Sequence, residues 1–541
     1  MPNEITDQAG QALASAIIGI LAIATVSCAT APAKVRRVGL GPEKLLSSDK
    51  SSLGGLIEVA LEDTAAERSN HALAHFVERW KRERGGAGEG VVSVEAKDGS
   101  ARRYRISFER GFHGSYPLSY FDEISPAVDY RVEKIPHHRR DGVGAPLVAV
   151  RENRKQDAIE AFFPPEAITR ALTAVVGSSR KVGDVVEVDI QLLCPLRNDE
   201  IIVDGKSVPL AADFTVPWAA LLARAGDLER SRYLDPLRRK PKREPQLYLM
   251  EDYDPKKEPL ILIHGLFDSP LVWAKLSNEL WADETVRERY QIWHYLYNTS
   301  APALYSGRIL RTQLREVRPL LDPTGRDPAM RSTTVIAHSM GGIITRSLIT
   351  RPGNAFWDAA FTQSFDSLTL SDADRDSLRE AFFWEPESHV RRVIYIAASH
   401  RGSNFADNFV GRLGRFVVHP PNQFAAFYNR ISAANPGAFT QAYVGLGKGK
   451  LNSVHALSPK QPTLKILADL PNSHRVATHS IIGNRGLPGP IEDSSDGIVE
   501  YWSSHVDNAD SEKIVPSDHY AMNHPDTVLE IKRILKLKRI R

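Results

Sequence analysis

The stretch TTVIAHSMGGII, Thr333 to Ile344, begins as an apolar run, breaks at a serine and then becomes apolar again. Ala337 and Gly341 stand two positions before and after Ser339. A strand that reverses sharply into a helix needs small residues at these positions, and such a turn holds one side chain out above the sheet. The pattern therefore predicts a strand that ends at Ala337, a helix after Gly341, and Ser339 as a nucleophile on the turn between them.

A second apolar run, Leu260 to Ile263, ends in His264 and Gly265, about seventy-five residues before this serine. A continuous apolar run is expected of a strand that is covered on both faces. A glycine after the strand lets the backbone turn so that a following amide points toward the serine. We therefore predict the backbone N–H groups of Leu266 and Met340 as the donors of an oxyanion hole, and we interpret His264 as structural.

An acid follows the serine in the chain, and histidines follow the acid. A serine nucleophile needs a base to take its proton, and the base needs an anion that orients its ring and stabilises its cationic form. Asp496 lies in a turn after the predicted strand His479 to Gly483, at the place where the order serine, acid, histidine requires the acid. We predict Asp496 for this role, with Asp493 as a weaker alternative.

The base is His519 or His524, because both follow the last predicted strand, Lys513 to Val515. His524 stands where the final helix begins, and the helix dipole disfavours a positive imidazolium at that end. We favour His519 as the base and keep His524 as the alternative. The chemistry of such a site requires neither a metal ion nor an organic cofactor, so we predict none.

The predicted catalytic domain at 247–541 resembles the lipase-type α/β-hydrolases over roughly Leu247 to Leu537. The motifs that carry the resemblance are His264-Gly265, Ala337 to Gly341, the sequence SHRGS at 399–403, and Ser495-Asp496-Gly497. The resemblance implies an α/β fold in which helices cover both faces of a mostly parallel sheet. The aromatic-rich segment of about 404–471 shows no clear strand, and we expect it to form a cap or lid over the site.

The same resemblance implies a serine esterase or lipase that cleaves carboxylic esters, lipid-like ones above all, through an acyl-enzyme. An acyltransferase would use the same three residues, and a surface-anchored binding protein on a hydrolase scaffold is the alternative from another class. In secreted bacterial triacylglycerol lipases, the base corresponds to His524 and a calcium ligand corresponds to Asp526. A single acid makes no calcium site, so we expect no metal here.

The N-terminal half predicts a separate domain at 53–232. Helical spacing of apolar residues covers roughly Leu53 to Arg84. Alternating patterns follow, including Ala158 to Phe163 and Val185 to Leu193, and they predict a mostly β domain for which a sandwich is one arrangement. A basic, proline-containing stretch at 233–246 predicts a linker to the second domain.

The first residues resemble the signal of a bacterial lipoprotein. An apolar run from Ala12 to Ser27 ends at Cys28, and the preceding small residues are similar to a lipobox, although Thr25 replaces the usual Leu and the start lacks Lys and Arg. The resemblance implies a signal at 1–28, lipidation of Cys28, and a tether at 29–52. Ala29 after the cysteine implies an outer-membrane anchor that faces the periplasm. An uncleaved anchor or a different start is the alternative.

The composition of the chain argues against some classes of binding partner. The 541 residues carry a formal net charge of +3 and no basic stripe with interleaved aromatics, which argues against nucleic acid. The two cysteines, Cys28 and Cys194, exclude a disulfide framework. We expect an ester or lipid substrate and a membrane attached through the lipid anchor, and the sequence gives no sign of a protein partner.

Overall fold

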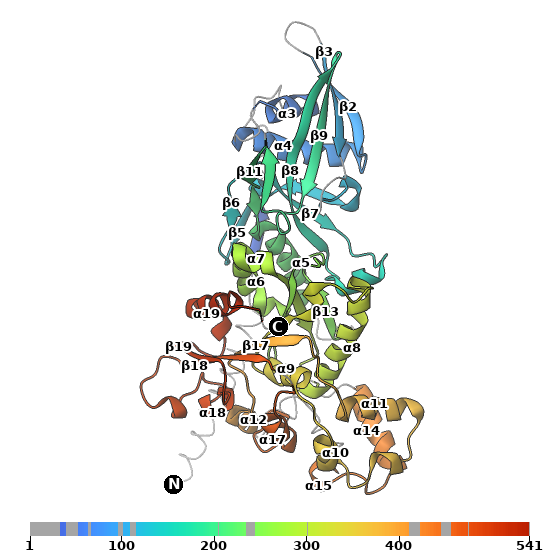
Figure 1. Cartoon of the computed structure of the whole chain (residues 1–541), viewed down its shortest axis with the longest axis vertical. Helices are drawn as coiled ribbons and strands as arrows, with labels where there is room; N and C mark the ends of the chain where they lie inside the picture. The colour runs from blue at the N-terminus through green and yellow to red at the C-terminus, as the bar shows by residue number, and fades with distance from the viewer. Residues whose placement is uncertain are drawn as a thin grey trace, which may run out of the picture. The chain divides into compact units, whose positions relative to one another are not determined.

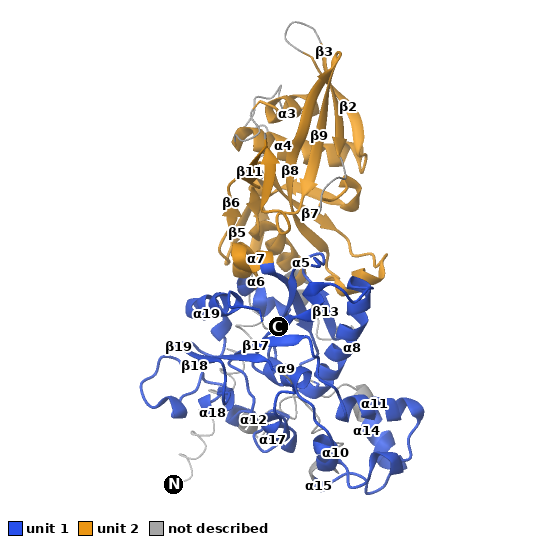
Figure 2. Cartoon of the chain, in the orientation of Figure 1, with its two compact units in different colours: residues 1–30, 239–276, 289–541 blue, residues 31–238, 277–288 orange. Residues whose placement is uncertain are grey.

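The computed structural model describes residues 33–38, 52–62, 67–95, 101–108, 115–203, 205–233, 244–299, 301–409, 422–444, 456–473 and 475–539. The predicted signal with Cys28, most of the tether and most of the basic linker lie outside these residues. The chain divides into two compact units (Figure 2). One unit contains Arg239–Leu276 and Arg289–Arg541, and the other contains Ala31–Arg238 and Ser277–Glu288.

The first unit is built on a seven-stranded sheet within the described residues (Figure 1). Its strands are β13 (Gln246–Leu249), β14 (Glu258–Ile263), β15 (Tyr290–Leu296), β16 (Thr333–His338), β17 (Val390–Ile396), β18 (Ala477–Gly483) and β19 (Ser511–Val515). The strand order is β13-β15-β14-β16-β17-β18-β19. Only β13 pairs antiparallel, and every other pair in this sheet is parallel. The prediction of an α/β fold with a mostly parallel sheet is therefore confirmed.

Helices alternate with these strands along the chain. They are α8 (Ala303–Leu321), α9 (Gly341–Ile349), α10 (Ala355–Ala360), α11 (Asp372–Phe382), α12 (Asn404–Phe409), α14 (Asn422–Ala434), α15 (Gln441–Val444), α17 (Pro462–Asp469), α18 (Tyr501–Ser504) and α19 (Pro525–Leu535). Helix α9 packs against β14, β16 and β17, and α8 packs against α9. Every residue of β14 and β16 is buried, as expected of central strands that are covered on both faces.

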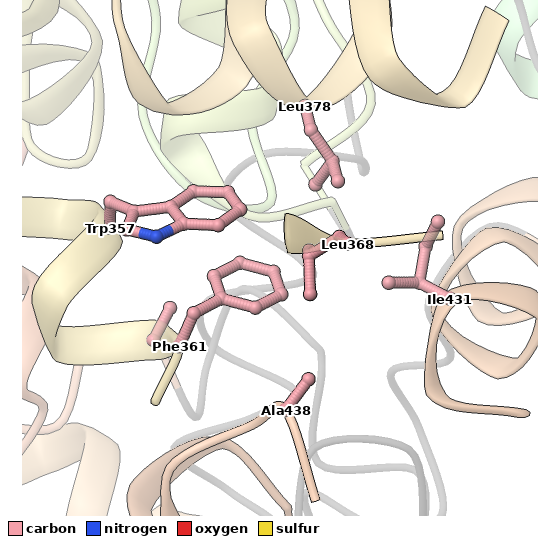
Figure 3. Close-up of a cluster of buried hydrophobic side chains, with 7 residues drawn as sticks. Trp357, Phe361, Leu368, Leu378, Ile431 and Ala438 are labelled. Carbon is pink, nitrogen blue, oxygen red and sulfur yellow. The ribbon is translucent and has the colours of Figure 1, made fainter. Parts of the chain in front are cut away.

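A separate apolar cluster joins helices from distant parts of the sequence (Figure 3). Trp357 and Phe361 stack with ring centroids 3.9 Å apart. Leu378 of α11 and Ile431 of α14 are buried in the same cluster. The predicted cap at 404–471 thus packs with a second segment, α10 to α11, that lies between α9 and β17 and that the sequence did not reveal.

The second unit contains a six-stranded sheet in the described residues, of order β2-β3-β9-β8-β7-β4. Its strands are β2 (Glu89–Glu95), β3 (Ala101–Phe108), β4 (Glu123–Pro126), β7 (Ala145–Arg151), β8 (Ile168–Val182) and β9 (Val185–Leu193). Short pairs join β1 (Lys34–Arg37) to β5 (Tyr130–Glu133), β6 (Arg139–Arg140) to β12 (Ala212–Asp213), and β10 (Glu200–Val203) to β11 (Lys206–Pro209). The helices are α3 (Leu53–Ala60), α4 (Glu67–Arg84) and α5 (Thr215–Tyr233).

Three details of this unit differ from the predictions. Helices α3 and α4 replace one long helix, and they pack against the sheet where a sandwich would have a second sheet. The predicted strand Ala158 to Phe163 is a 3-10 helix, η4 (Ala158–Phe162). Alternation misled here because Glu160 is buried and pairs with Arg151, so this polar residue does not mark a solvent-facing position.

The second unit also includes a segment, Ser277–Glu288, that lies between β14 and β15 in the sequence. This segment spans parts of α6 (Ala274–Ala282) and α7 (Glu284–Arg289). The ring of Trp281 meets Trp218 edge to face at 5.1 Å, and Arg287 forms an ion pair with Asp199 at 2.6 Å. Contacts between residues far apart in sequence therefore set the extent of this unit.

Candidate active site

Ser339 stands on a sharp turn between β16 and α9. Its φ of 53° lies in the left-handed region, which a residue with a side chain rarely adopts. The backbone N–H of Ser339 donates to the carbonyl of Ile396 at 3.0 Å, and its own carbonyl accepts from the N–H of Gly342 at 2.9 Å. These bonds hold the strained residue at the carboxyl end of a central strand, as the TTVIAHSMGGII stretch predicts.

The glycine after the turn is required by close packing. A Cβ on Gly341 would lie 2.6 Å from the carbonyl oxygen of Ile263 and 2.7 Å from that of His264. Both neighbours are backbone atoms, so they can shift only if β14 moves. The small residue predicted at position 341 thus has a structural cause, which is the approach of α9 to the end of β14.

Ser339, His519 and Asp496 form one hydrogen-bonded chain. The Nε2 atom of His519 lies 2.9 Å from the Oγ atom of Ser339, and its Nδ1 atom lies 2.8 Å from Oδ2 of Asp496. Asp496 Oδ1 accepts from the backbone N–H groups of Ile498 at 2.8 Å and Val499 at 2.7 Å. With Nδ1–H donating to Asp496, Nε2 is the acceptor that faces the serine hydroxyl.

Electrostatics favours a charged carboxylate beside this histidine. Burial opposes ionisation of Asp496, but the charge and hydrogen bond of His519 and the two amide N–H groups hold the pKa of Asp496 below its ordinary value. Burial alone would lower the pKa of His519, whereas the carboxylates of Asp496, Asp268 and Asp518 raise it above its ordinary value. The imidazolium form of His519 is therefore stabilised in this site.

His524 and Asp493, the alternative base and acid, have no described contact with Ser339. His524 is the N-cap of α19, and its Nδ1 atom accepts from the N–H of Asp526 at 3.2 Å. Asp493 is exposed in a short 3-10 helix, whereas Asp496 is 2% exposed. The structure thus brings His519 and Asp496 to Ser339 and leaves His524 and Asp493 in these other settings.

The two predicted oxyanion donors belong to segments that meet at the serine. Met340 directly follows Ser339 and caps the N-terminus of α9. Leu266 follows Gly265, whose Cβ, if present, would lie 2.9 Å from the Cβ of Ser339. The loop after β14 therefore packs directly on the turn, and Gly265 is needed for that approach. His264 is buried, and burial lowers its pKa to about 4, consistent with a structural, uncharged residue.

The SHRGS motif braces the loop that carries the acid. The hydroxyl of Ser403 donates to the carbonyl of Ile498, two residues after Asp496. Gly402 has a φ of 87°, and the hydroxyl of Ser503 donates to its carbonyl. These bonds tie the segment after β17 to the segment that presents Asp496.

A cavity of about 210 Å³ adjoins the turn. Met340 and Ile343 of the turn and of α9 line it, and other lining residues, including Phe361 and Ile431, belong to the apolar cluster of Figure 3. Its lining is mainly aromatic and aliphatic. Its walls include residues of α10 and α11, whose positions in the cap the sequence does not predict. The apolar residues of these two helices are the sequence signal that indicates burial.

One group of residues in the described part of the chain has the composition of a metal site, and it lies in the second unit. It consists of His75, Glu78 and Asp129. Arg37 already forms ion pairs with both carboxylates, at 2.6 Å and 2.8 Å. At Ser339, by contrast, one imidazole and one carboxylate are joined by hydrogen bonds. This arrangement suits acid–base catalysis.

Several solved structures are similar to about half of this chain. They include the mature lipase BlEst2 from Bacillus licheniformis, with 16% identity over 53% of this chain and 95% of that one, and a TM-score of 0.31. Lipase 1 from Pelosinus fermentans has 13% identity over 52% of this chain and all of that one, with a TM-score of 0.33. The metagenomic carboxyl esterase MGS0156 has 16% identity over 52% and 76%, with a TM-score of 0.30.

No protein-family model and no curated protein matches this chain. Because the sequence identities are 16% or less and the TM-scores are 0.33 or less, these structures carry no argument about the active site. The assignment of the active site rests on the geometry of this chain alone. Among the described helices, none combines the length and the apolar character that crossing a membrane would need.

Proposed function

We propose that this protein is a serine hydrolase of carboxylic esters. The observation that carries the proposal is the hydrogen-bonded chain from Ser339 through His519 to Asp496, with distances of 2.9 Å and 2.8 Å. A serine on a strained turn, a neutral imidazole acceptor and a buried carboxylate are the parts that nucleophilic acyl transfer needs.

In the proposed reaction, the Oγ atom of Ser339 attacks the ester carbonyl while Nε2 of His519 takes the hydroxyl proton. The backbone N–H groups of Met340 and Leu266 bind the oxyanion, where one such donor contributes about 2.7–4 kcal/mol. His519 then gives the proton to the leaving alcohol, which departs and leaves an acyl-enzyme on Ser339. Water, activated by the same imidazole, releases the acid and restores the serine.

The substrate class that we propose is an ester with an apolar acyl group. The cavity beside Met340 is lined by apolar side chains of α10, α11 and α14. Burying a methylene group in such surroundings contributes about 0.8 kcal/mol. An acyl chain directed past Met340 would bury its methylene groups there, which supports a lipid-like substrate over a short polar one.

We also propose that the enzyme is anchored to the outer membrane, facing the periplasm, through lipidated Cys28. The proposal rests on the apolar run and lipobox-like residues before this cysteine. Replacement of Cys28 by Ser should move the protein from the membrane fraction to the soluble fraction without changing its esterase activity. Retention of Cys28→Ser in the membrane fraction would contradict lipidation at this residue.

The experiment that tests the function is a hydrolysis assay over p-nitrophenyl esters from acetate to palmitate, with Ser339→Ala as the matched variant. The proposal expects turnover that increases with acyl length and then falls, and its loss in Ser339→Ala at an unchanged melting temperature. Added alcohol acceptors identify a transferase if they divert the acyl group from water. Absence of ester turnover and of transfer in the parent protein would contradict the proposal.

A further inference from the structure

A second set of polar contacts runs beside the Ser339-His519-Asp496 chain. The Nε2 atom of His338 donates to the backbone carbonyl of His519 at 2.8 Å. Nδ1 of His338 lies 3.4 Å from Oδ2 of Asp268, and the hydroxyl of Tyr520 donates to Oδ1 of Asp268 at 3.3 Å. These contacts connect the loop after β14, the end of β16 and the loop after β19.

The carbonyl of His519 fixes the protonation of one nitrogen of His338. A carbonyl oxygen can only accept, so Nε2 of His338 must carry a hydrogen. Nδ1 lies 3.4 Å from Oδ2 of Asp268 with no hydrogen bond between them, and the side chains of His338 and Asp268 are only 1% and 2% exposed. The hydrogen bond from Nε2 of His338 therefore ties the end of β16 to the loop after β19.

Close packing shows that the pair fills the space between these loops. A Cβ on Gly265 would lie 2.8 Å from Nδ1 of His338 and 3.2 Å from Oδ2 of Asp268. The same Cβ would lie 2.9 Å from the Cβ of Ser339. The glycine of the His264-Gly265 motif is therefore needed as much for the His338–Asp268 pair as for the serine turn.

His338 contacts the proposed base, His519, directly. The ring centroids of His338 and His519 are 4.7 Å apart, and the hydrogen bond from His338 holds the backbone of His519 itself. A shift of about 1 Å in a reacting group can lower a rate by about 100-fold. A side chain that fixes the backbone of the base thus controls the distance between Nε2 of His519 and Oγ of Ser339.

We propose that His338 and Asp268 are positioning residues for the base, His338 by holding the carbonyl of His519 and Asp268 by placing a negative charge near the imidazole. This inference rests on the proposed function of Ser339, His519 and Asp496. His338 is not a catalytic residue in this account, because it acts through His519.

Several ionisable groups surround the two histidines. Asp496, Asp268 and Asp518 act on His519, and each raises its pKa. His264 lies near both Asp268 and His338, and burial lowers its pKa to about 4, so it adds no positive charge near neutral pH. The hydroxyl of Tyr520 donates a hydrogen bond to Asp268. Removing the charge of Asp268 should therefore make His519 a weaker base.

The test compares His338→Leu, which removes the donor, with His338→Gln, which offers an N–H donor of similar reach. We expect kcat of His338→Leu on a p-nitrophenyl ester to fall about 10- to 100-fold with KM nearly unchanged, and His338→Gln to recover most of the loss. Asp268→Asn should shift the acidic limb of the kcat/KM profile to lower pH. Unchanged kcat in folded His338→Leu, or an unshifted limb in folded Asp268→Asn, would overturn the inference.

Labelling with a fluorophosphonate separates this inference from the proposed function. If the parent protein reacts at Ser339 and hydrolyses esters while folded His338→Leu keeps the parent kcat, only the positioning role is refuted. If the parent protein neither reacts nor hydrolyses, the proposed function fails and the positioning role fails with it. Melting temperatures of all variants identify any that have merely lost their fold, and His338→Gln then serves as the folded comparison.

Discussion

His519 Nε2 and Ser339 Oγ lie 2.9 Å apart, although 180 positions separate the two residues in the chain. The parallel sheet produces this meeting, because β16 and β19 present their carboxyl ends along the same edge. The serine leaves the sheet at the end of β16, and the histidine leaves it after β19.

Replacing His519 should affect activity, and replacing His524 should affect stability. His519→Ala should lower kcat by about a million-fold, because Ser339 loses its proton acceptor. His524→Ala should keep activity and lower the free energy of unfolding by about 0.5–2 kcal/mol, because α19 loses its N-cap. Kinetics and urea unfolding of both variants provide the measurement. Loss of activity in His524→Ala alone would assign the base to His524.

The pH profile should report the pKa of His519. The base must be neutral to accept the proton, and its pKa is raised above the ordinary value of 6.5, so kcat/KM should rise with pH through a limb centred above pH 6.5. Asp496→Asn removes a cause of the raised pKa, so its residual activity should show a limb at lower pH, together with a loss of about 10,000-fold in kcat. If the limb of Asp496→Asn stays at the pH of the parent protein, Asp496 does not raise the pKa of the catalytic base.

Gly341→Ala should destabilise the first unit. The new methyl group would meet two backbone carbonyl oxygens at 2.6 Å and 2.7 Å, and such overpacking costs about 1–3 kcal/mol. Because the displaced atoms belong to the end of β14 and its loop, esterase activity should also fall. An unchanged urea midpoint with full activity would show that β14 and α9 do not approach as described.

Filling the cavity should shorten the preferred acyl chain. Ala381 lines the cavity, so Ala381→Trp should lower kcat/KM for long-chain esters by about tenfold or more and leave acetate esters unaffected. Asp376→Trp, on the exposed face of the same helix, is the matched control and should leave the chain-length profile unchanged. Equal profiles for both tryptophan variants would remove this cavity from the acyl site.

The sequence predicted the sheet of the first unit well because its buried strands are local apolar runs. The serine turn could be predicted for the same reason, since Ala337, Ser339 and Gly341 lie within five consecutive residues. His519 and His524 could be separated only by an argument from the helix dipole. The structure shows that His519 contacts Ser339 and that His524 caps α19.

Contacts between residues far apart in the sequence could not be predicted from local patterns. Trp357, Phe361 and Ile431 are ordinary apolar residues in the sequence, and their cluster appears only when α10 and α14 meet. In the same way, no local pattern at Trp281 indicates its contact with Trp218. The strand predicted at Ala158 to Phe163 was wrong because the pattern assumed that Glu160 is exposed. Its ion pair with Arg151 instead allows this charged side chain to be buried.

The most direct test of the central claim is the site of covalent labelling by a fluorophosphonate, mapped by peptide mass spectrometry. We predict one label for each protein molecule on the peptide that contains Ser339, none in Ser339→Ala, and much slower labelling in His519→Ala. Labelling of another serine, or equal labelling rates in the parent protein and His519→Ala, would contradict the assignment of Ser339 as a nucleophile activated by His519.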